Sequence, residues 1–225
     1  MQGNSSPVRS RQYTSHVRLD EIVRRHLEMT WQAPVHSHTA RALDPLLYEL
    51  ADEPRPVVLD SGCGDGRSTQ RLAYRFPDHV VVGLDRSAAR LQKLAPGGLL
   101  HRGNLWLIRA EIADAWRLLA DAGVQVSHHY ILYPNPWPKP THVRRRWHAH
   151  PVFPWLLVLG GLLELRSNWS VYVREFDRAL FLAGRDSALD LVAEDEPPLT
   201  PFERKYRDSG HTLWRLRSDL RKVRR

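Results

Sequence analysis

The sequence predicts an α/β fold with a mostly parallel central sheet and helices on both of its faces. Three observations support this prediction. From Pro56 onward, short apolar runs recur, turn residues bound each run, and amphipathic stretches of helical length separate most of them. Strands that alternate with helices of this length form βαβ units, whose crossover connections favour parallel pairing. The 225 residues, 42% of them hydrophobic, suffice for one domain with a substantial core.

The predicted elements follow one another in a regular order. Residues 1–40 are polar, rich in arginine and histidine and weakly periodic, so we expect a basic, partly flexible N-terminal arm with one helix from Leu19 to Met29. Residues 41–225 are expected to form the single domain. Its predicted strands are residues 56–60, 79–85, 105–111, 128–133, 161–167 and 211–217. Its predicted helices are residues 67–76, 87–94, 112–122, 150–159 and 170–183.

The charge of the chain is strongly basic, with 33 Lys and Arg residues against 25 Asp and Glu residues and a net charge of +8. This surplus favours a polyanionic partner, with nucleic acid ahead of a membrane surface. A second explanation stays open, because 29 of the 33 basic residues are arginine and such a bias can reflect the base composition of a genome.

Cysteine and histidine usage excludes several kinds of site. The single cysteine, Cys63, cannot form an internal disulfide or an all-cysteine metal site. The twelve histidines include close pairs, but these lack acids or thiols at ligand spacing, so no metal site is expected. No apolar run reaches the roughly 18 residues of a membrane span, and the N-terminus lacks a secretory core. We therefore expect a soluble, cytoplasmic protein without a membrane partner.

A glycine-rich loop follows the first predicted strand in the segment DSGCGDG, with Asp60 at the strand end and glycines at positions 62, 64 and 66. A dinucleotide-binding fingerprint would need glycine at position 67, where the chain has Arg67. Glycines let a backbone lie close against a ligand, and an acid at the strand end can accept a hydrogen bond from a ligand amino group. A glycine-rich turn without a ligand is the alternative.

Two further acids lie at predicted strand ends. Asp85 follows Gly66 by nineteen residues, close to the spacing that places an acid on the ribose hydroxyls of a nucleoside cofactor, although it could also cap the following helix. Glu111 closes the third predicted strand, where it could face an adenine or simply be solvated. The pattern G-x-G-x-G preceded by an acid resembles the cofactor loop of class I S-adenosylmethionine-dependent methyltransferases.

The segment YPNPWPKPTHVRRRW, residues 133–147, carries a proline at every second position from Pro134 to Pro140. Proline cannot donate to a sheet ladder, so it ends the fourth predicted strand and stiffens the loop at the sheet edge where ligands bind. Trp137 offers a face for a flipped base, and we expect the arginines at 144, 145 and 146 to contact phosphates. A proline-stiffened surface turn before a basic helix start is the alternative.

Three ordered motifs resemble the bacterial tRNA (guanine-N7)-methyltransferases, which methylate a guanosine in the tRNA variable loop. They are the proline loop, which resembles a PDPW-type loop followed by Lys, His and a basic run, then GGLLELRSNW (160–169), and TPFERKYRDSGHTLWRL (200–216). The resemblance spans about residues 56–217. It implies a Rossmann-like class I methyltransferase fold with an antiparallel final strand, S-adenosylmethionine as cofactor, and tRNA or another RNA as partner of a monomer or homodimer.

The resemblance also implies roles for individual positions. Those at the reaction centre are Asn135, His142 and Arg145. Those that hold S-adenosylmethionine are Asp60, Gly62, Gly64, Gly66, Asp85 and Glu111. Those that contact the tRNA or the target base are Trp137, Lys139, Asn168, Thr200 and Glu203. Judged without the motif, His142 would be a surface histidine and Glu203 an exposed acid paired with Arg204 or Arg207.

The chain departs from this family at the reaction centre. Asn135 and Asn168 stand where the family has Asp, and Thr141 replaces an expected arginine before His142. Guanine N7 needs no general base, but a carboxylate stabilises the cationic product better than an amide does. Two alternatives therefore stay open beside the guanine-N7 reaction. One is a methyltransferase for an exocyclic amine, and the other is an RNA-binding paralogue with weakened turnover.

Overall fold

The computed structural model describes residues 3–224, which gather into two compact units. The glycine-loop unit comprises residues 33–132 and 158–161, and the proline-loop unit comprises the remaining described residues, 3–32, 133–157 and 162–224. Each unit takes its name from the motif that it carries. The expectation of a single domain over residues 41–225 stays a prediction. None of the helices within residues 3–224 has the length and apolar character needed to cross a membrane.

The glycine-loop unit contains five strands, and their burial explains their pairing. β1 and β2 are buried along their whole length, as expected for parallel strands covered on both faces. β1 pairs in parallel with β2 and with β5, β2 pairs in parallel with β4, and β3 forms an antiparallel hairpin with β4. In spatial order the strands are β3 (Leu99–Arg102), β4 (Leu105–Arg109), β2 (Val80–Asp85), β1 (Val57–Ser61) and β5 (Val126–Leu132).

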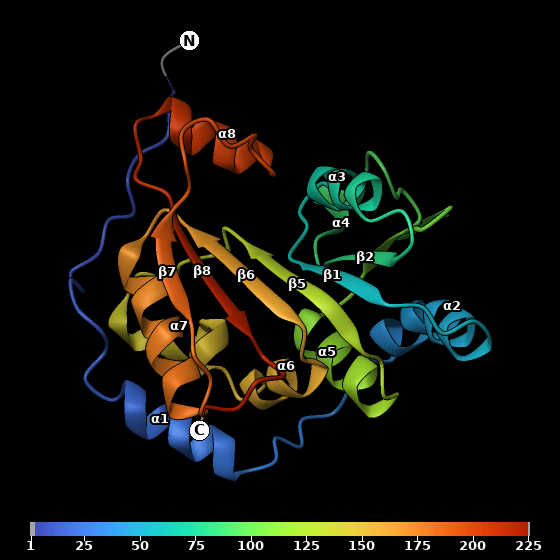
Figure 1. The fold of residues 1–225 in the computed structure, drawn as a ribbon, viewed down its shortest axis with the longest axis horizontal. Helices are drawn as coiled ribbons and strands as arrows, with labels where there is room; N and C mark the ends of the chain where they lie inside the picture. Colours follow the sequence, from blue (N-terminus) through green and yellow to red (C-terminus); the bar gives the residue numbers. More distant parts are fainter. Residues whose placement is uncertain (1–2, 225) are drawn as a thin grey trace. The chain divides into compact units, whose positions relative to one another are not determined.

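The strand order determines on which face of the sheet the crossover helices of this unit lie. The crossover from β1 to β2 runs one way along the sheet, and the crossover from β4 to β5 runs back the other way. Because such crossovers are right-handed, the helices that they carry, α3 and α5, must lie on opposite faces. Figure 1 shows this arrangement. The helices are α2 (Ser37–Asp52), α3 (Arg67–Arg75), α4 (Ala88–Leu91) and α5 (Ile112–Asp121).

The proline-loop unit combines an antiparallel sheet with residues 3–32 of the N-terminal arm. Its strands β6 (Leu162–Ser167), β8 (Trp214–Asp219) and β7 (Ala188–Leu191) pair antiparallel in that order. Helix α1 (Leu19–Glu28) of the arm packs against α7 (Ser170–Leu182), as seen in Figure 1. Two short 3₁₀ helices, η1 (Pro140–Arg145) and η2 (Trp147–Ala149), follow the prolines. The other helices are α8 (Pro201–Asp208) and α6 (Phe153–Leu159), of which residues 153–157 belong to this unit.

These elements confirm the predicted α/β fold, its antiparallel final strand and the helix of the arm. Two strands, β3 and β7, were not expected, because their side chains are largely exposed and carry no apolar run. Helices α2 and α8 were not expected either. The third predicted strand ends at Arg109 rather than at Glu111, and 3₁₀ turns replace the helix start considered after the prolines.

Gly83 in the middle of β2 lies where α3 packs closely against the sheet. A Cβ atom at this position would lie 2.3 Å from the Thr69 hydroxyl oxygen and 2.8 Å from a Leu107 methyl carbon. A side chain there would push α3 away from β2, and with it the loop that leads into α3.

We predict that Gly83→Ala lowers the free energy of unfolding by about 1–3 kcal/mol, because the added methyl group overpacks the α3–β2 contact. The matched control is Gly97→Ala, where a Cβ atom would meet nothing within 4 Å. Urea unfolding of both variants measures the difference. Equal stability of the two variants would show that α3 does not pack as described.

Candidate functional site

The glycine loop turns sharply between β1 and α3. Gly62, Gly64 and Gly66 have φ angles of 85°, 63° and 81°, which side-chain-bearing residues rarely adopt. A Cβ atom at Gly66 would lie 2.7 Å from a methyl carbon of Leu107, whereas one at Gly64 would meet nothing within 4 Å. The loop therefore closes tightly against the sheet at Gly66 and borders open space at Gly64.

Asp60 lies at the end of β1 and is fully buried. Its Oδ2 atom accepts hydrogen bonds from the hydroxyls of Ser68, at 2.6 Å, and Thr69, at 2.8 Å, while its Oδ1 atom has no partner. Burial raises the pKa of Asp60 to about 6, even though the two hydroxyls favour the carboxylate. Asp60 thus holds a spare acceptor that a cationic donor would stabilise.

Asp85 ends β2 and braces the glycine loop. One carboxylate oxygen accepts from the backbone N–H of Gly64, at 3.0 Å, and the other accepts from the N–H of Ser87, at 2.8 Å. Arg90 approaches the same carboxylate at 3.4 Å. The cap of α4 is Ser87, whose hydroxyl oxygen accepts from the N–H of Arg90. The contact with ribose hydroxyls that we expect for Asp85 stays a prediction. The Asp85 carboxylate already holds the glycine loop through the N–H of Gly64.

Glu111 lies two residues beyond β4, at the start of α5. Its backbone N–H donates to the Thr39 hydroxyl at 3.0 Å, and its side chain makes no capping hydrogen bond. In the sheet register Asp85 pairs with Arg109, so Glu111 lies just past the end of the strand beside β2. Asp60, Asp85 and Glu111 thus all lie at the carboxyl ends of parallel strands, where ligands of α/β sheets bind.

The proline loop in the other unit is held in an unusual backbone conformation. Tyr133 and Trp137 have φ angles of 52° and 45°, which are uncommon for residues other than glycine. The exposed Asn135 side chain accepts a hydrogen bond from the N–H of Trp137 at 3.3 Å. An aspartate could accept the same bond, so Asn135 preserves the turn while removing one negative charge.

Trp137, His142 and Arg145 form a cluster on this loop. The Arg145 guanidinium lies 4.7 Å from the centroid of the Trp137 ring, and the His142 ring meets the indole edge-on at 5.6 Å. The pKa of His142 lies below its ordinary value, because its partial burial and the nearby cations Arg145 and Lys139 disfavour the imidazolium. The cluster therefore presents an aromatic ring, a neutral imidazole and a guanidinium together.

The three consecutive arginines do not share one role. Arg144 and Arg145 are exposed, but Arg146 is fully buried and forms an ion pair with Glu175 at 2.5 Å. The expectation that Arg146 contacts phosphate is therefore wrong, because its guanidinium has no exposed surface. Sequence reasoning missed Glu175, since its partner lies 29 residues away.

The other predicted contact residues lie around α8 in the same unit. Asn168 is hydrogen-bonded to His211 at 3.1 Å, and Thr200 caps α8 by accepting from the N–H of Glu203 at 2.9 Å. Glu203 has no exposed surface, so the reading of it as an exposed acid is wrong. It pairs with Arg166 at 2.7 Å and more distantly with Arg207 at 3.6 Å. Its proposed contact with RNA stays a prediction.

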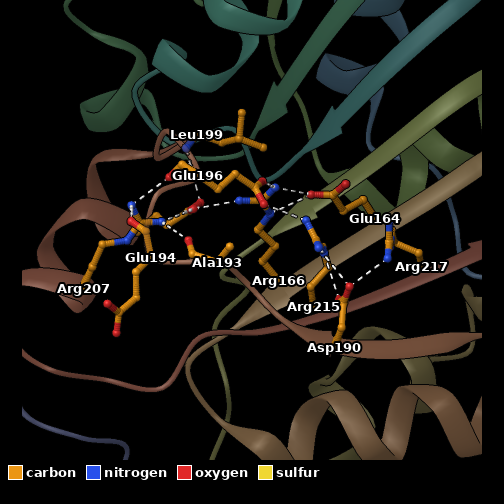
Figure 2. A network of polar contacts seen from close by, with 11 residues as sticks. Glu164, Arg166, Asp190, Ala193, Glu194, Glu196, Leu199, Arg207, Arg215 and Arg217 are labelled. Carbon is orange, nitrogen blue, oxygen red and sulfur yellow. Dashed lines mark hydrogen bonds and ion pairs between the residues drawn. The ribbon is translucent and has the colours of Figure 1, made fainter.

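A network of charged side chains holds the segment before α8 against the strands. Figure 2 shows Arg166 of β6 and Arg215 of β8 converging on Glu196, with Asp190 bridging Arg215 and Arg217. Burial raises the pKa of Glu203 although Arg166 opposes the shift. The alternation of arginines with apolar residues along β8 is the signal that could have revealed this network.

Aromatic rings join the proline loop to α8. The Tyr133 ring lies 5.4 Å from that of Tyr206, which stacks in turn on His211 at 5.3 Å. His211 is the partner of Asn168. The proline loop and the α8 motif, which the sequence separates by more than fifty residues, thus meet in one unit.

Comparisons with known sequences show which proteins the chain resembles. A family model described as "Putative methyltransferase" matches residues 54–216. The tRNA (guanine-N(7)-)-methyltransferase of Neisseria meningitidis serogroup C, serotype 2a, is 30% identical over 172 residues, which cover 72% of this chain and 71% of the relative. The protein of the same name from Leifsonia xyli subsp. xyli is 27% identical over 222 residues, covering 93% and 95%.

Comparisons with solved structures show the same fold. A variant of 16S rRNA (adenine(1408)-N(1))-methyltransferase from Catenulisporales acidiphilia, solved with its cosubstrate SAM, matches with a TM-score of 0.55 and 20% identity. The match covers 78% of this chain and 90% of that one. The 16S rRNA methyltransferase KamB gives the same TM-score and identity, and covers 78% and 93%.

We predict that Asp60→Asn makes the protein more stable than the wild type at pH 7, by about 1–3 kcal/mol. The unfolded chain releases the Asp60 proton near pH 3.8 and the folded chain near pH 6, so the stability of the wild type falls as the pH rises between these values. Asp60→Asn has no carboxyl group to titrate, so its stability does not fall for this reason. Urea unfolding at pH 4 and pH 7 measures the effect, and an equal difference between variant and wild type at both pH values would contradict it.

Proposed function

The chain belongs to this methyltransferase family as a divergent relative of the tRNA (guanine-N(7)-)-methyltransferases, and we propose that it methylates N7 of a variable-loop guanosine in tRNA. The observation that carries the proposal is the meeting of the proline loop and the α8 motif in one unit, where the Tyr133 ring contacts Tyr206 and Asn168 is hydrogen-bonded to His211. The net charge of +8 suits an RNA substrate. We place the protein in the cytoplasm, as a monomer or homodimer.

The glycine-loop unit supplies groups that fit S-adenosylmethionine. The unpartnered Oδ1 atom of Asp60 would accept from the ammonium group, and the open space at Gly64 would let the ligand lie against the backbone. Asp85 would hold the ribose hydroxyls, and Glu111 would face the adenine. When bound, the cofactor supplies an electrophilic methyl group on a sulfonium ion.

The proline-loop unit supplies groups that fit a guanine base. Trp137 offers a stacking surface, and the exposed Arg144 and Arg145 would contact the phosphates beside it. Guanine N7 has an in-plane lone pair and no proton, so no general base is needed. The Asn135 amide would stabilise the positive charge that develops on the base only through its dipole, less well than a carboxylate would.

A second candidate is methyl transfer to an exocyclic amine, and the amide of Asn135 is the observation that favours it. An amide oxygen can accept from an amino group and direct its lone pair toward a methyl donor. Against this candidate, the Asn135 oxygen already accepts from the N–H of Trp137. A catalytically weakened RNA-binding protein is the third possibility, and one assay separates all three.

We predict that the purified protein transfers labelled methyl groups from S-adenosylmethionine to bulk tRNA, and that the product nucleoside is 7-methylguanosine. Asn135→Asp should raise the rate by about tenfold, because a carboxylate stabilises the cationic product more strongly than an amide. Chromatography of the digested tRNA measures both results. Label in an exocyclic methylamine supports the second candidate, and tRNA binding without transfer supports the third.

We predict that Arg144→Ala and Arg145→Ala each weaken tRNA binding and lower the slope of log affinity against log salt by about one. Each variant removes an exposed guanidinium on the proline loop. Arg102→Ala, at an exposed position of β3 in the other unit, is the matched control and should leave the slope unchanged. Titrations at several salt concentrations provide the slopes. Equal slopes for all variants would exclude phosphate contacts by these arginines.

A further inference from the structure

Three segments that are far apart in the sequence meet at the carboxylate of Glu175 on α7. This carboxylate is fully buried and accepts hydrogen bonds from the Gln12 side chain at 2.6 Å and the His16 backbone N–H at 2.7 Å. It also accepts from Arg146 at 2.5 Å and lies 3.0 Å from the His148 imidazole. Burial alone would raise the pKa of Glu175, but His148 and Arg146 hold it at about 2. The carboxylate is therefore ionised and fully engaged.

Arg146 connects this carboxylate to the proline loop. Its Nε and Nη2 atoms donate to the carbonyl of Trp137 at 3.3 Å and 3.0 Å, and Nη2 also donates to the Gln12 side-chain oxygen at 2.9 Å. The guanidinium lies 4.8 Å from the centroid of the Trp169 ring. A planar guanidinium can make these contacts together because its donors form a fixed fork.

The loop needs hydrogen-bond donors other than its own backbone N–H groups. Its four prolines, at alternate positions from Pro134 to Pro140, have no backbone N–H, so the loop cannot hold its shape through its own ladder of hydrogen bonds. The remaining carbonyls must be bound by other groups if the backbone is to keep the positive φ of Trp137. Arg146 binds the carbonyl of Trp137.

The N-terminal arm binds the next carbonyl. The Ser10 hydroxyl donates to the carbonyl of Pro138 at 2.7 Å, and the same hydroxyl accepts from the Gln12 backbone N–H at 2.9 Å. Two consecutive carbonyls of the proline loop are thus held by Arg146 and by the arm. Gln12 contributes to both, since its side chain contacts Arg146 and Glu175.

We propose that Ser10, Gln12, Arg146 and Glu175 are positioning residues that fix the Trp137 indole for the target base, which makes the N-terminal arm a working part of the substrate site. The proposal rests on the proposed function for its effect on methyl transfer. Its structural part concerns only the arm and the loop, so the two can fail independently.

The test follows Trp137 directly in full-length protein labelled with 5-fluorotryptophan. One of the eight tryptophan ¹⁹F resonances disappears in Trp137→Phe, which assigns it. Gln12→Leu and Ser10→Ala should each shift or broaden this resonance, because each removes a brace of the loop. The matched controls are Gln32→Leu and Ser15→Ala, at exposed positions of the arm, and they should leave it unchanged.

Kinetics of methyl transfer test the functional part. The double variant Ser10→Ala with Gln12→Leu should lower kcat by about tenfold or more, because a misplaced base reacts slowly. KM for S-adenosylmethionine should stay within about twofold of the wild-type value, since that ligand binds elsewhere. Arg146→Lys keeps a positive partner for Glu175 but loses the fork on the Trp137 carbonyl, so it should shift the same resonance in folded protein.

An unchanged Trp137 resonance in Gln12→Leu, Ser10→Ala and Arg146→Lys would overturn the proposal, as would a shifted resonance with unchanged kcat. If the wild type transfers no methyl group to any tRNA, the proposed function fails. In that case the fluorine spectra still decide whether the arm positions the loop.

Discussion

The buried ion pair between Arg146 and Glu175 is the interaction on which the proline-loop unit depends. Both side chains are fully buried, and removing one partner of such a pair costs about 3–5 kcal/mol because an uncompensated charge remains. A loop with alternating prolines lacks the donors to organise its own backbone. The guanidinium supplies them, and Glu175 orients the guanidinium while binding the arm. The conformation of Trp137 therefore depends on residues from three parts of the sequence.

The two units differ in the kinds of side chain that they carry at the candidate site. The glycine-loop unit combines glycines with positive φ and buried acids, and burial raises the pKa of Asp60, so the carboxylate form of Asp60 is disfavoured in the folded protein. The proline-loop unit uses rings and arginines, which suit a base and its phosphates. Asn135 keeps the turn that an aspartate would make but not its charge.

The sequence predicted the parts of the molecule whose cause is local. Buried strands such as β1 and β2 carry continuous apolar runs, so they could be recognised. The glycine loop could be recognised because its backbone has positive φ angles, which favour glycine. The exposed strands β3 and β7 have no such pattern and were missed. They form by pairing with β4 and β8, and this pairing leaves no pattern in their own residues.

The roles of charged side chains could not be predicted for a related reason. Nothing in the run of three arginines distinguishes Arg146 from Arg145, because only the turn of η1 and a distant carboxylate direct one inward and leave the other exposed. Glu203 likewise looks like a surface acid until its pairing with Arg166 is seen. The resemblance to the family located these positions. It could not distinguish residues that stabilise the protein through ion pairs from residues that contact RNA.

Hydrogen exchange of peptides from residues 133–149 tests most directly whether the proline loop is already formed before any RNA binds. In free protein, this segment should exchange much more slowly than an unfolded peptide, because the hydrogen bonds of η1 and η2 and the braces on the loop are already formed. Addition of tRNA should increase that protection only slightly. Exchange at the unfolded rate in free protein, with protection appearing only on tRNA binding, would show that the loop forms only when RNA binds.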